Sequence, residues 1–195
     1  MGLPPAGVEV KLVPFQNAFE MRVKGLHVTP GYWRQPELTA QAFDEEGYYR
    51  LGDAFAFEDS GRPEIGLLFA GRIAEDFKLS TGTWVHVGAL RAGFIAHFAP
   101  LVRDVVIAGE GRNEVGALIF LAGKASKEEL LAKLKTLDGT GSSNRIARAM
   151  VLEEPPSLDA GEATDKGSIN QKAVLARRAA AVDELYSDSR RVLLA

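Results

Sequence analysis

The sequence has no cysteine, which excludes disulfides, thiolate metal ligands and a cysteine nucleophile together. Its three histidines, at positions 27, 86 and 97, are scattered without the spacing of metal ligands. Each is more typical of a loop or core residue, so we expect no metal site. No segment reaches the roughly 18 apolar residues of a membrane span, and the N-terminus lacks the pattern of a signal peptide. The sequence therefore predicts a soluble, cytoplasmic protein.

Neither sign of charge dominates the chain. Lys+Arg number 23 and Asp+Glu number 26, which gives a formal net charge of −3. Without a strong electrostatic field, binding to nucleic acid or to an anionic membrane surface is disfavoured. The hydrophobic fraction of 46% is sufficient for a packed core, and 195 residues fit one ordinary domain or two small ones.

The first 70 residues have the pattern of β structure. Apolar and polar residues alternate over residues 8–13, 19–25 and 53–59. A short helix is expected at 36–42, and a loop at 58–64 leads into an apolar strand expected at 65–69. Such short strands favour a small barrel or distorted sheet. Because a domain does not easily begin at residue 1 without a preceding partner strand, we expect this chain to be the later part of a longer protein.

After Arg72 the spacing of apolar residues changes, and segments with helical spacing are interleaved with short strands. Helices are expected at 87–98 and at 169–185. Another helix is expected to begin after Ser126, which is a good N-cap with Glu129 at the capping-box position. Strands are expected at 102–108, 115–121 and 147–153. The predicted fold class is α+β, with a small β-rich, barrel-like subdomain at residues 1–71 and a compact mixed α+β domain at residues 72–195.

Several segments together resemble one family. YYRLGDAF at 48–55 and GLLFAGRIAEDFKLSTGTWV at 66–85 are similar to the domain junction of the adenylate-forming superfamily, which includes acyl-CoA synthetases, nonribosomal adenylation domains and luciferases. The resemblance extends from GLPPAGVEVKL at the N-terminus to ATDKGSINQK at 163–172. Within the superfamily, the chain looks most like feruloyl-CoA synthetases and related aryl or acyl acid ligases.

The resemblance implies two nucleotide-binding residues. Asp53 corresponds to the family's aspartate that binds the ATP ribose, and a carboxylate can accept hydrogen bonds from both ribose hydroxyls. Arg72 corresponds to an arginine that also reaches the nucleotide, and its planar guanidinium suits ribose or phosphate oxygens. Taken alone, Asp53 after Gly52 is more typical of a turn.

The same resemblance implies a hinge and a thioester-forming turn. The family's pivot position holds Ala74 here, so the pivot is expected within residues 73–76. Lys78, Gly82 and Trp84 correspond to the turn that helps form the pantetheine tunnel after the C-terminal domain rotates. Glycine permits close approach of backbone to a ligand. For Trp84 alone, a core position in a hairpin is an equally good interpretation.

The C-terminal catalytic lysine of the family has two candidates. Adenylation joins a carboxylate to an anionic phosphate, so a positioned cation should stabilise the transition state. The family places a lysine after a TxxG sequence, where this chain has Ser168. Lys166 is the first candidate and Lys172 the second, with a solvated loop lysine as the alternative for either.

The implied whole enzyme activates a carboxylic acid with ATP and Mg²⁺ to an acyl-adenylate and transfers the acyl group to coenzyme A. No glycine-rich phosphate loop occurs in this chain, so the family's phosphate loop and acyl pocket are expected in a preceding N-terminal domain, and this chain alone is expected to be inactive. Exposed apolar surface is expected where that domain packs, and a homodimer could form through it. Two alternatives are an adenylation domain that transfers to a carrier protein, and a non-catalytic binding module on the same scaffold.

Overall fold

The computed structural model describes residues 2–195 and has two compact units, divided between Ala74 and Glu75. Each unit has its own sheet. The predicted α+β class is confirmed. The interpretation of residues 1–71 as the end of a larger N-terminal domain and of residues 72–195 as a mobile domain stays a prediction. Within the described residues, no helix combines the length and the apolar character that crossing a membrane requires.

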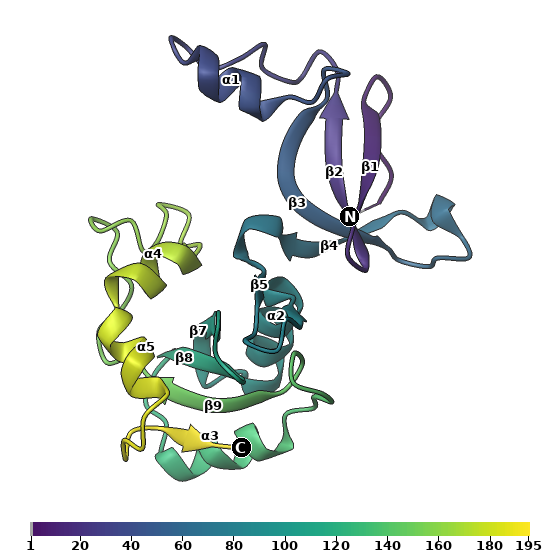
Figure 1. Ribbon diagram of the computed structural model, residues 1–195. Coiled ribbons are helices and arrows are strands. Elements are labelled where there is room, and N and C mark those ends of the chain that lie inside the picture. The colour runs from purple at the N-terminus through teal and green to yellow at the C-terminus, as the bar shows by residue number, and fades with distance from the viewer. Residues whose placement is uncertain (1) are drawn as a thin grey trace. The chain divides into compact units, whose positions relative to one another are not determined.

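The first unit is a four-stranded antiparallel sheet in the order β1-β2-β3-β4, with a short helix between β2 and β3 (Figure 1). The sheet is open, so it is not a closed barrel. Its apolar face packs around Phe55, whose ring meets that of Phe69 edge-on at 5.8 Å. The elements are β1 (Glu9–Phe15), β2 (Ala18–Lys24), α1 (Pro36–Ala42), β3 (Tyr49–Phe57) and β4 (Leu67–Arg72).

The strand expected at 65–69 is present, but its bounds differ from the prediction. Residues 63–65 form a 3₁₀ turn that starts with Pro63, a residue favoured at a first helical position. The strand β4 therefore begins at Leu67 and continues to Arg72, so the Gly-Arg pair belongs to the sheet.

The second unit is built on a mixed sheet in the order β10-β9-β8-β7, in which β8 and β9 are parallel and the other pairs antiparallel. A two-stranded hairpin precedes the first helix. The elements are β5 (Phe77–Lys78), β6 (Trp84–Val85), α2 (Val87–Phe98), β7 (Val102–Ala108), β8 (Val115–Leu121), α3 (Lys127–Thr136), β9 (Ile146–Val151), α4 (Gln171–Arg177), α5 (Ala179–Leu185) and β10 (Leu193–Leu194).

Alternation along β7 and β8 separates two apolar clusters. Val105 and Ile107 pack on one side with the β5–β6 hairpin, α2 and α3, whereas Val106 and Leu118 pack on the other with α4 and α5. Successive side chains of a strand point to opposite faces, so both faces of this sheet are covered. The α4–α5 pair lies along one side of the unit in Figure 1.

Local sequence signals account for the first two helices of this unit. In α2, Phe94 and Phe98 are fully buried and their rings stack at 4.0 Å between centroids. In α3, the Ser126 side chain accepts from the Glu129 backbone and the Glu129 side chain accepts from the Ser126 backbone. The predicted capping box is therefore confirmed.

The prediction of a single helix at 169–185 is wrong. The structure has two helices, which begin at Gln171 and Ala179 and meet at Arg178, a residue with φ −104° and ψ 35°. The Arg178 side chain bonds to buried Glu162 rather than continuing an exposed helical stripe. Periodicity could not reveal this break, because the partner lies in a distant loop.

Candidate functional site

Asp53 and Arg72 are direct cross-strand neighbours in the first unit. They pair in the β3–β4 ladder, and Arg72 Nε lies 3.7 Å from Asp53 Oδ1. The Asp53 side chain is 27% exposed and that of Arg72 is 69% exposed, so both can still reach a ligand. Burial raises the pKa of the Asp53 carboxyl, while the charge of Arg72 opposes that rise. The structure thus brings the carboxylate of Asp53 beside the guanidinium of Arg72, two groups that the sequence motifs named separately.

Irregular pairing in β3 sets the position of Asp53. The β2–β3 register shifts between Glu20 and Arg22, opposite the residues around Gly52. Gly52 has φ +72°, a conformation that glycine adopts without steric cost. A second register shift follows at Ala54 in the β3–β4 ladder. The Gly-Asp sequence therefore marks a bulged strand, not the simple turn that Asp53 alone would suggest.

Lys78, Gly82 and Trp84 lie on one hairpin of the second unit. Lys78 and Trp84 are paired across β5 and β6, with the Lys78 Nζ 5.0 Å from the centre of the Trp84 ring. Phe77 and Val85 are buried, so the alternate residues Lys78 and Trp84 face outward. Trp84 is 37% exposed and is therefore not a core residue. Gly82 closes the turn with φ +81°, which favours glycine.

A neighbouring turn holds this hairpin in place. The backbone N–H of Ser80 donates to the Arg112 carbonyl at 2.8 Å, and that of Gly111 donates to the Lys78 carbonyl at 3.0 Å. The Ser80 hydroxyl also donates to the Asn113 amide oxygen at 2.6 Å. The β7–β8 turn therefore supports the hairpin from which Lys78 and Trp84 project.

Asp76 fixes the chain just after the expected hinge. Its carboxylate accepts from the backbone N–H of Val87 at 3.0 Å and lies 2.9 Å from His86 Nδ1. The Asp76 side chain is only 5% exposed. It thus supplies an acceptor for the first turn of α2, where helix N–H groups lack partners. Of the expected hinge residues 73–76, Asp76 is firmly built into the second unit.

Lys166 lies at the tip of a small hairpin. The strands of this hairpin meet at the bridge between Ala163 and Ile169, and Thr164 N–H donates to the Ser168 carbonyl at 2.9 Å. Lys172 lies in the first turn of α4, which is capped by Asn170. Both lysines are exposed, and within residues 2–195 neither ammonium has an ion pair or hydrogen bond.

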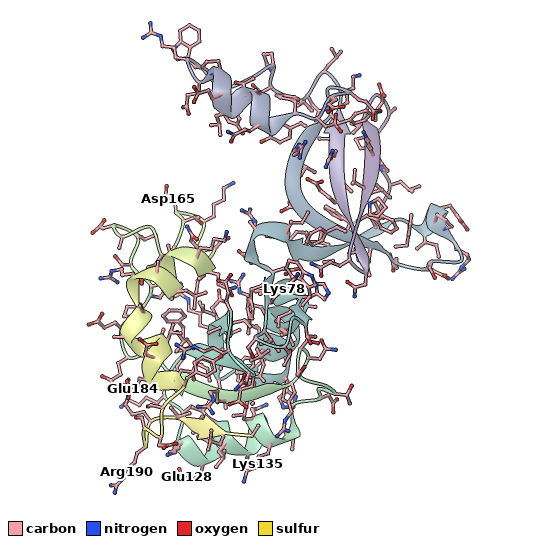
Figure 2. All side chains as sticks on the ribbon, in the orientation of Figure 1. Lys78, Glu128, Lys135, Asp165, Glu184 and Arg190 are labelled. Atoms are coloured by element: carbon pink, nitrogen blue, oxygen red, sulfur yellow. The ribbon has the colours of Figure 1, made fainter. Side chains whose placement is uncertain are left out.

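The Lys166 and Lys78 segments lie at the same end of the second unit but on separate sides of it. Figure 2 shows Asp165, the neighbour of Lys166, well separated from Lys78, with Lys135 and Arg190 at the other end. A cleft of about 340 Å³ lies beside the hairpin tip. Its lining includes Arg103, Phe120, Pro155, Leu158, Thr164 and Asp165.

Sequence reasoning missed two buried polar residues next to the candidate lysines. Among the described residues, Glu162 and Gln171 are the buried polar or charged ones, at 0% and 3% exposure. Gln171 Oε1 accepts from the Ile107 backbone at 3.0 Å, which ties α4 to β7. No local pattern distinguishes Glu162 from the solvated carboxylates around it, since its partner Arg178 lies 16 residues later in the chain.

No metal site is formed within the part of the chain that the structure describes, because no group of three or more histidine, aspartate or glutamate side chains is suitably arranged.

The chain resembles known adenylate-forming proteins. A fatty acid–[acyl-carrier-protein] ligase of Arabidopsis thaliana is 26% identical over 95% of this chain and 29% of that protein. A fatty acid–CoA ligase of Mycobacterium tuberculosis is 25% identical over 86% of this chain and 31% of that protein. The solved A domain of carboxylic acid reductase from Segniliparus rugosus, in complex with AMP and a co-purified carboxylic acid, is 25% identical with a TM-score of 0.75, over 91% of this chain and 31% of that one.

The chain spans less than a third of the length of these relatives. The family described as the AMP-binding enzyme C-terminal domain matches residues 78–190, which is more than half of the sequence. The chain therefore belongs to this family of adenylate-forming enzyme domains.

Proposed function

We propose that this chain is the last subdomain and the C-terminal domain of an acid–CoA ligase. The whole enzyme would activate a carboxylic acid with ATP and then form the CoA thioester, with a ferulate-like or other aryl or acyl acid as substrate. The resemblance of residues 71–92 and 164–171 to feruloyl-CoA synthetases motivates the choice of acid. The pocket for that acid would lie in a preceding domain. That domain would also cover exposed apolar side chains of the first unit, among them Leu26, Trp33 and Phe69.

The observation that carries this proposal is the Asp53–Arg72 pair. Asp53 would accept hydrogen bonds from the ribose hydroxyls of ATP. Arg72, whose side chain is largely exposed, would donate to ribose or phosphate oxygens in a fixed fork. Two groups with complementary roles thus converge on one edge of the first unit, as a nucleoside site requires.

In the first half-reaction, a carboxylate oxygen of the acid would attack the α-phosphorus of ATP. The new bond links carboxyl oxygen to phosphorus, and pyrophosphate leaves. Lys166 would stabilise the negative charge shared by the two anions, with Lys172 as the second candidate. The exposed, unpaired ammonium of Lys166 at a hairpin tip supports this assignment.

In the second half-reaction, the CoA thiolate would attack the acyl carbon and AMP would leave. The hairpin with Lys78, Gly82 and Trp84 would line the approach of the pantetheine arm. Rotation of the second unit about residues 73–75 would withdraw Lys166 from the active site and bring this hairpin into it. The two segments would occupy the active site in turn, one for each half-reaction.

A second candidate is transfer of the acyl group to a carrier protein. The similarity to a fatty acid–[acyl-carrier-protein] ligase favours it. The adenylation step would be unchanged, and only the attacking thiol would differ. A non-catalytic module is the third possibility, supported by Ala74 at the pivot position and by the displaced lysine.

The test measures pyrophosphate release and CoA-thioester formation by the full-length protein with ferulate, caffeate, benzoate and fatty acids. Wild type is compared with Lys166→Ala, Lys172→Ala and the control Lys135→Ala, which lies at the opposite end of the second unit (Figure 2). We expect Lys166→Ala to slow pyrophosphate release about 100-fold, as for loss of one charge-stabilising group. The control should stay close to wild type.

Each outcome separates the candidates. An aromatic acyl-CoA whose formation fails in one lysine variant supports the ligase and identifies the cation. Pyrophosphate release without thioester favours carrier-protein transfer, while thioester from fatty acids alone removes the ferulate assignment. Absence of both products with every acid would support the non-catalytic module.

A further inference from the structure

The loop that precedes α4 is held by a buried carboxylate. Glu162 is 0% exposed, although it lies in a polar surface loop. Its Oε1 accepts from Arg178 Nε and its Oε2 from Arg178 Nη2, both at 2.8 Å. The Ser157 backbone N–H donates to Oε2 at 2.8 Å, and Arg177 Nη1 lies 3.2 Å away. The carboxylate is therefore bonded on both oxygens.

Arg178 connects this carboxylate to the start of the loop. Its Nη1 donates to the Glu154 carbonyl and its Nη2 to the Pro155 carbonyl, each at 2.8 Å. The guanidinium also lies 5.3 Å from the centre of the Phe120 ring on β8. Since Arg178 is the junction of α4 and α5, one side chain joins the loop, the helices and the sheet.

The Lys166 hairpin begins directly after Glu162. The Glu162 carbonyl accepts from Asn170 N–H at 2.9 Å, and the bridge between Ala163 and Ile169 follows. Glu162 is therefore at the base of the hairpin and Lys166 at its tip. Any tilt of the base would displace the tip, because the intervening residues are bonded to one another as a unit.

Stability alone does not explain this arrangement. A buried ion pair is weak evidence of net stabilisation, since desolvation offsets much of the attraction. Its bidentate geometry does, however, fix direction as well as distance. We propose that Glu162 and Arg178 form a positioning pair that aims the hairpin, so that Lys166 reaches the adenylation centre. This inference rests on the proposed function and deepens it.

The test uses Glu162→Gln in the full-length protein, with Arg178→Lys as a second variant and Glu114→Gln as the control. Glutamine keeps the shape but places an amide N–H₂ against the guanidinium, and lysine keeps the charge but not the fork. Glu114 also pairs with an arginine, Arg148, with Arg148 Nε at 2.7 Å, but it lies outside this loop. Adenylation is followed by pyrophosphate release with ferulate, and thioester formation from supplied feruloyl-adenylate and CoA is followed separately.

We expect Glu162→Gln to lower kcat for adenylation about 10- to 100-fold, as for an ångström-scale misplacement of a catalytic group. KM for ATP and ferulate and the thioester step should stay within about threefold of wild type, because the altered pair lies outside the ATP and thioester sites proposed above. Arg178→Lys should show a smaller loss of the same kind. In a Lys166→Ala background, Glu162→Gln should cost almost nothing further, since Glu162 is proposed to act only by positioning Lys166.

Several results would overturn the proposal. These are an equal loss in both half-reactions, no loss in either, or full additivity with Lys166→Ala. Coupling to Lys172→Ala instead would assign the pair to a different cation and likewise refute it. If wild type releases no pyrophosphate with any acid, the proposed function fails first, and that outcome is distinct from all of these.

Discussion

At the scale of single residues, the Asp53–Arg72 pair shows how a sheet assembles a binding group. Neither residue is unusual in its own strand. The antiparallel β3–β4 register places them opposite each other, and cross-strand neighbours have Cβ atoms about 4.5–5.5 Å apart. Asp53 is partly shielded and Arg72 is open to solvent, so a ligand can bond to both.

Replacing Asp53 with asparagine tests its role. One carboxylate oxygen becomes a donor that cannot accept from a ribose hydroxyl, so the full-length protein should lose about 1.5–3 kcal/mol of ATP binding. That corresponds to a KM for ATP raised about 10- to 150-fold, with a smaller change in kcat. The control is Asp59→Asn, whose carboxylate pairs with Arg62 in an exposed loop of the same unit. An unchanged KM for Asp53→Asn would remove this residue from the nucleotide site.

At the scale of elements, local signals and distant partners contribute differently. The helix at Pro36–Ala42, the helix at Val87–Phe98 and the capping box at Ser126 follow from residues within one or two turns. Arg178, where the two helices meet, bonds to Glu162, which lies 16 positions earlier. An ion pair that no local pattern indicates therefore ties the loop of residues 153–170 to these helices.

This loop should be sensitive to acid. The hydrogen bonds from Arg178 lower the pKa of Glu162 from 4.5 to about 2, so the folded state favours the charged form. The resulting stability is present above pH 4.5 and is lost as the pH falls towards 2, by up to about 3 kcal/mol at 1.36 kcal/mol per unit. Hydrogen exchange at residues 157–170, corrected for intrinsic rates, should show this loss in wild type.

The glutamine variant provides the comparison for the acid experiment. In Glu162→Gln the loop should exchange faster at pH 7, and its protection should change less between pH 5 and 3. Glu128→Gln, on the exposed first turn of α3, should behave as wild type. If wild type and Glu162→Gln lost protection in parallel, another group would control the loop.

At the scale of the whole molecule, a short segment of chain links the two units. Residues 73–75 form a 3₁₀ turn, the unit boundary falls between Ala74 and Glu75, and Asp76 is bonded into the second unit. If the proposed rotation occurs, its change in φ and ψ must be absorbed before Asp76.

Proline at position 74 tests this hinge. It fixes φ near −65° at residue 74 and disfavours the helical region for Ile73, so only one arrangement of the units should remain accessible. In the full-length protein with Ala74→Pro, one half-reaction should fall about tenfold or more while the other stays within about threefold, as expected for a gating step. The control Ala74→Gly, which adds freedom, should keep both. Equal retention or equal loss of both rates in Ala74→Pro would argue against a pivot here.

The class of fold, most of the elements and the family could be predicted from the sequence, because these depend on periodicity, caps and short motifs that are local. Alternation of apolar and polar residues predicted the strands of the first sheet, and the resemblance of the Gly-Asp and Gly-Arg motifs named the residues of the Asp53–Arg72 pair. What these motifs do chemically stays a prediction that the experiments above address.

How those residues are held could not be predicted, because it follows from tertiary contacts. The tertiary structure paired Asp53 with Arg72 through strand register, turned Trp84 outward by burying its neighbour Val85, and committed Asp76 to the start of α2. It also placed Glu162 in the interior beneath the Lys166 hairpin. Each of these depends on contacts between residues far apart in the chain, and a carboxylate in a polar loop gives no local sign of whether its partner will be water or an arginine.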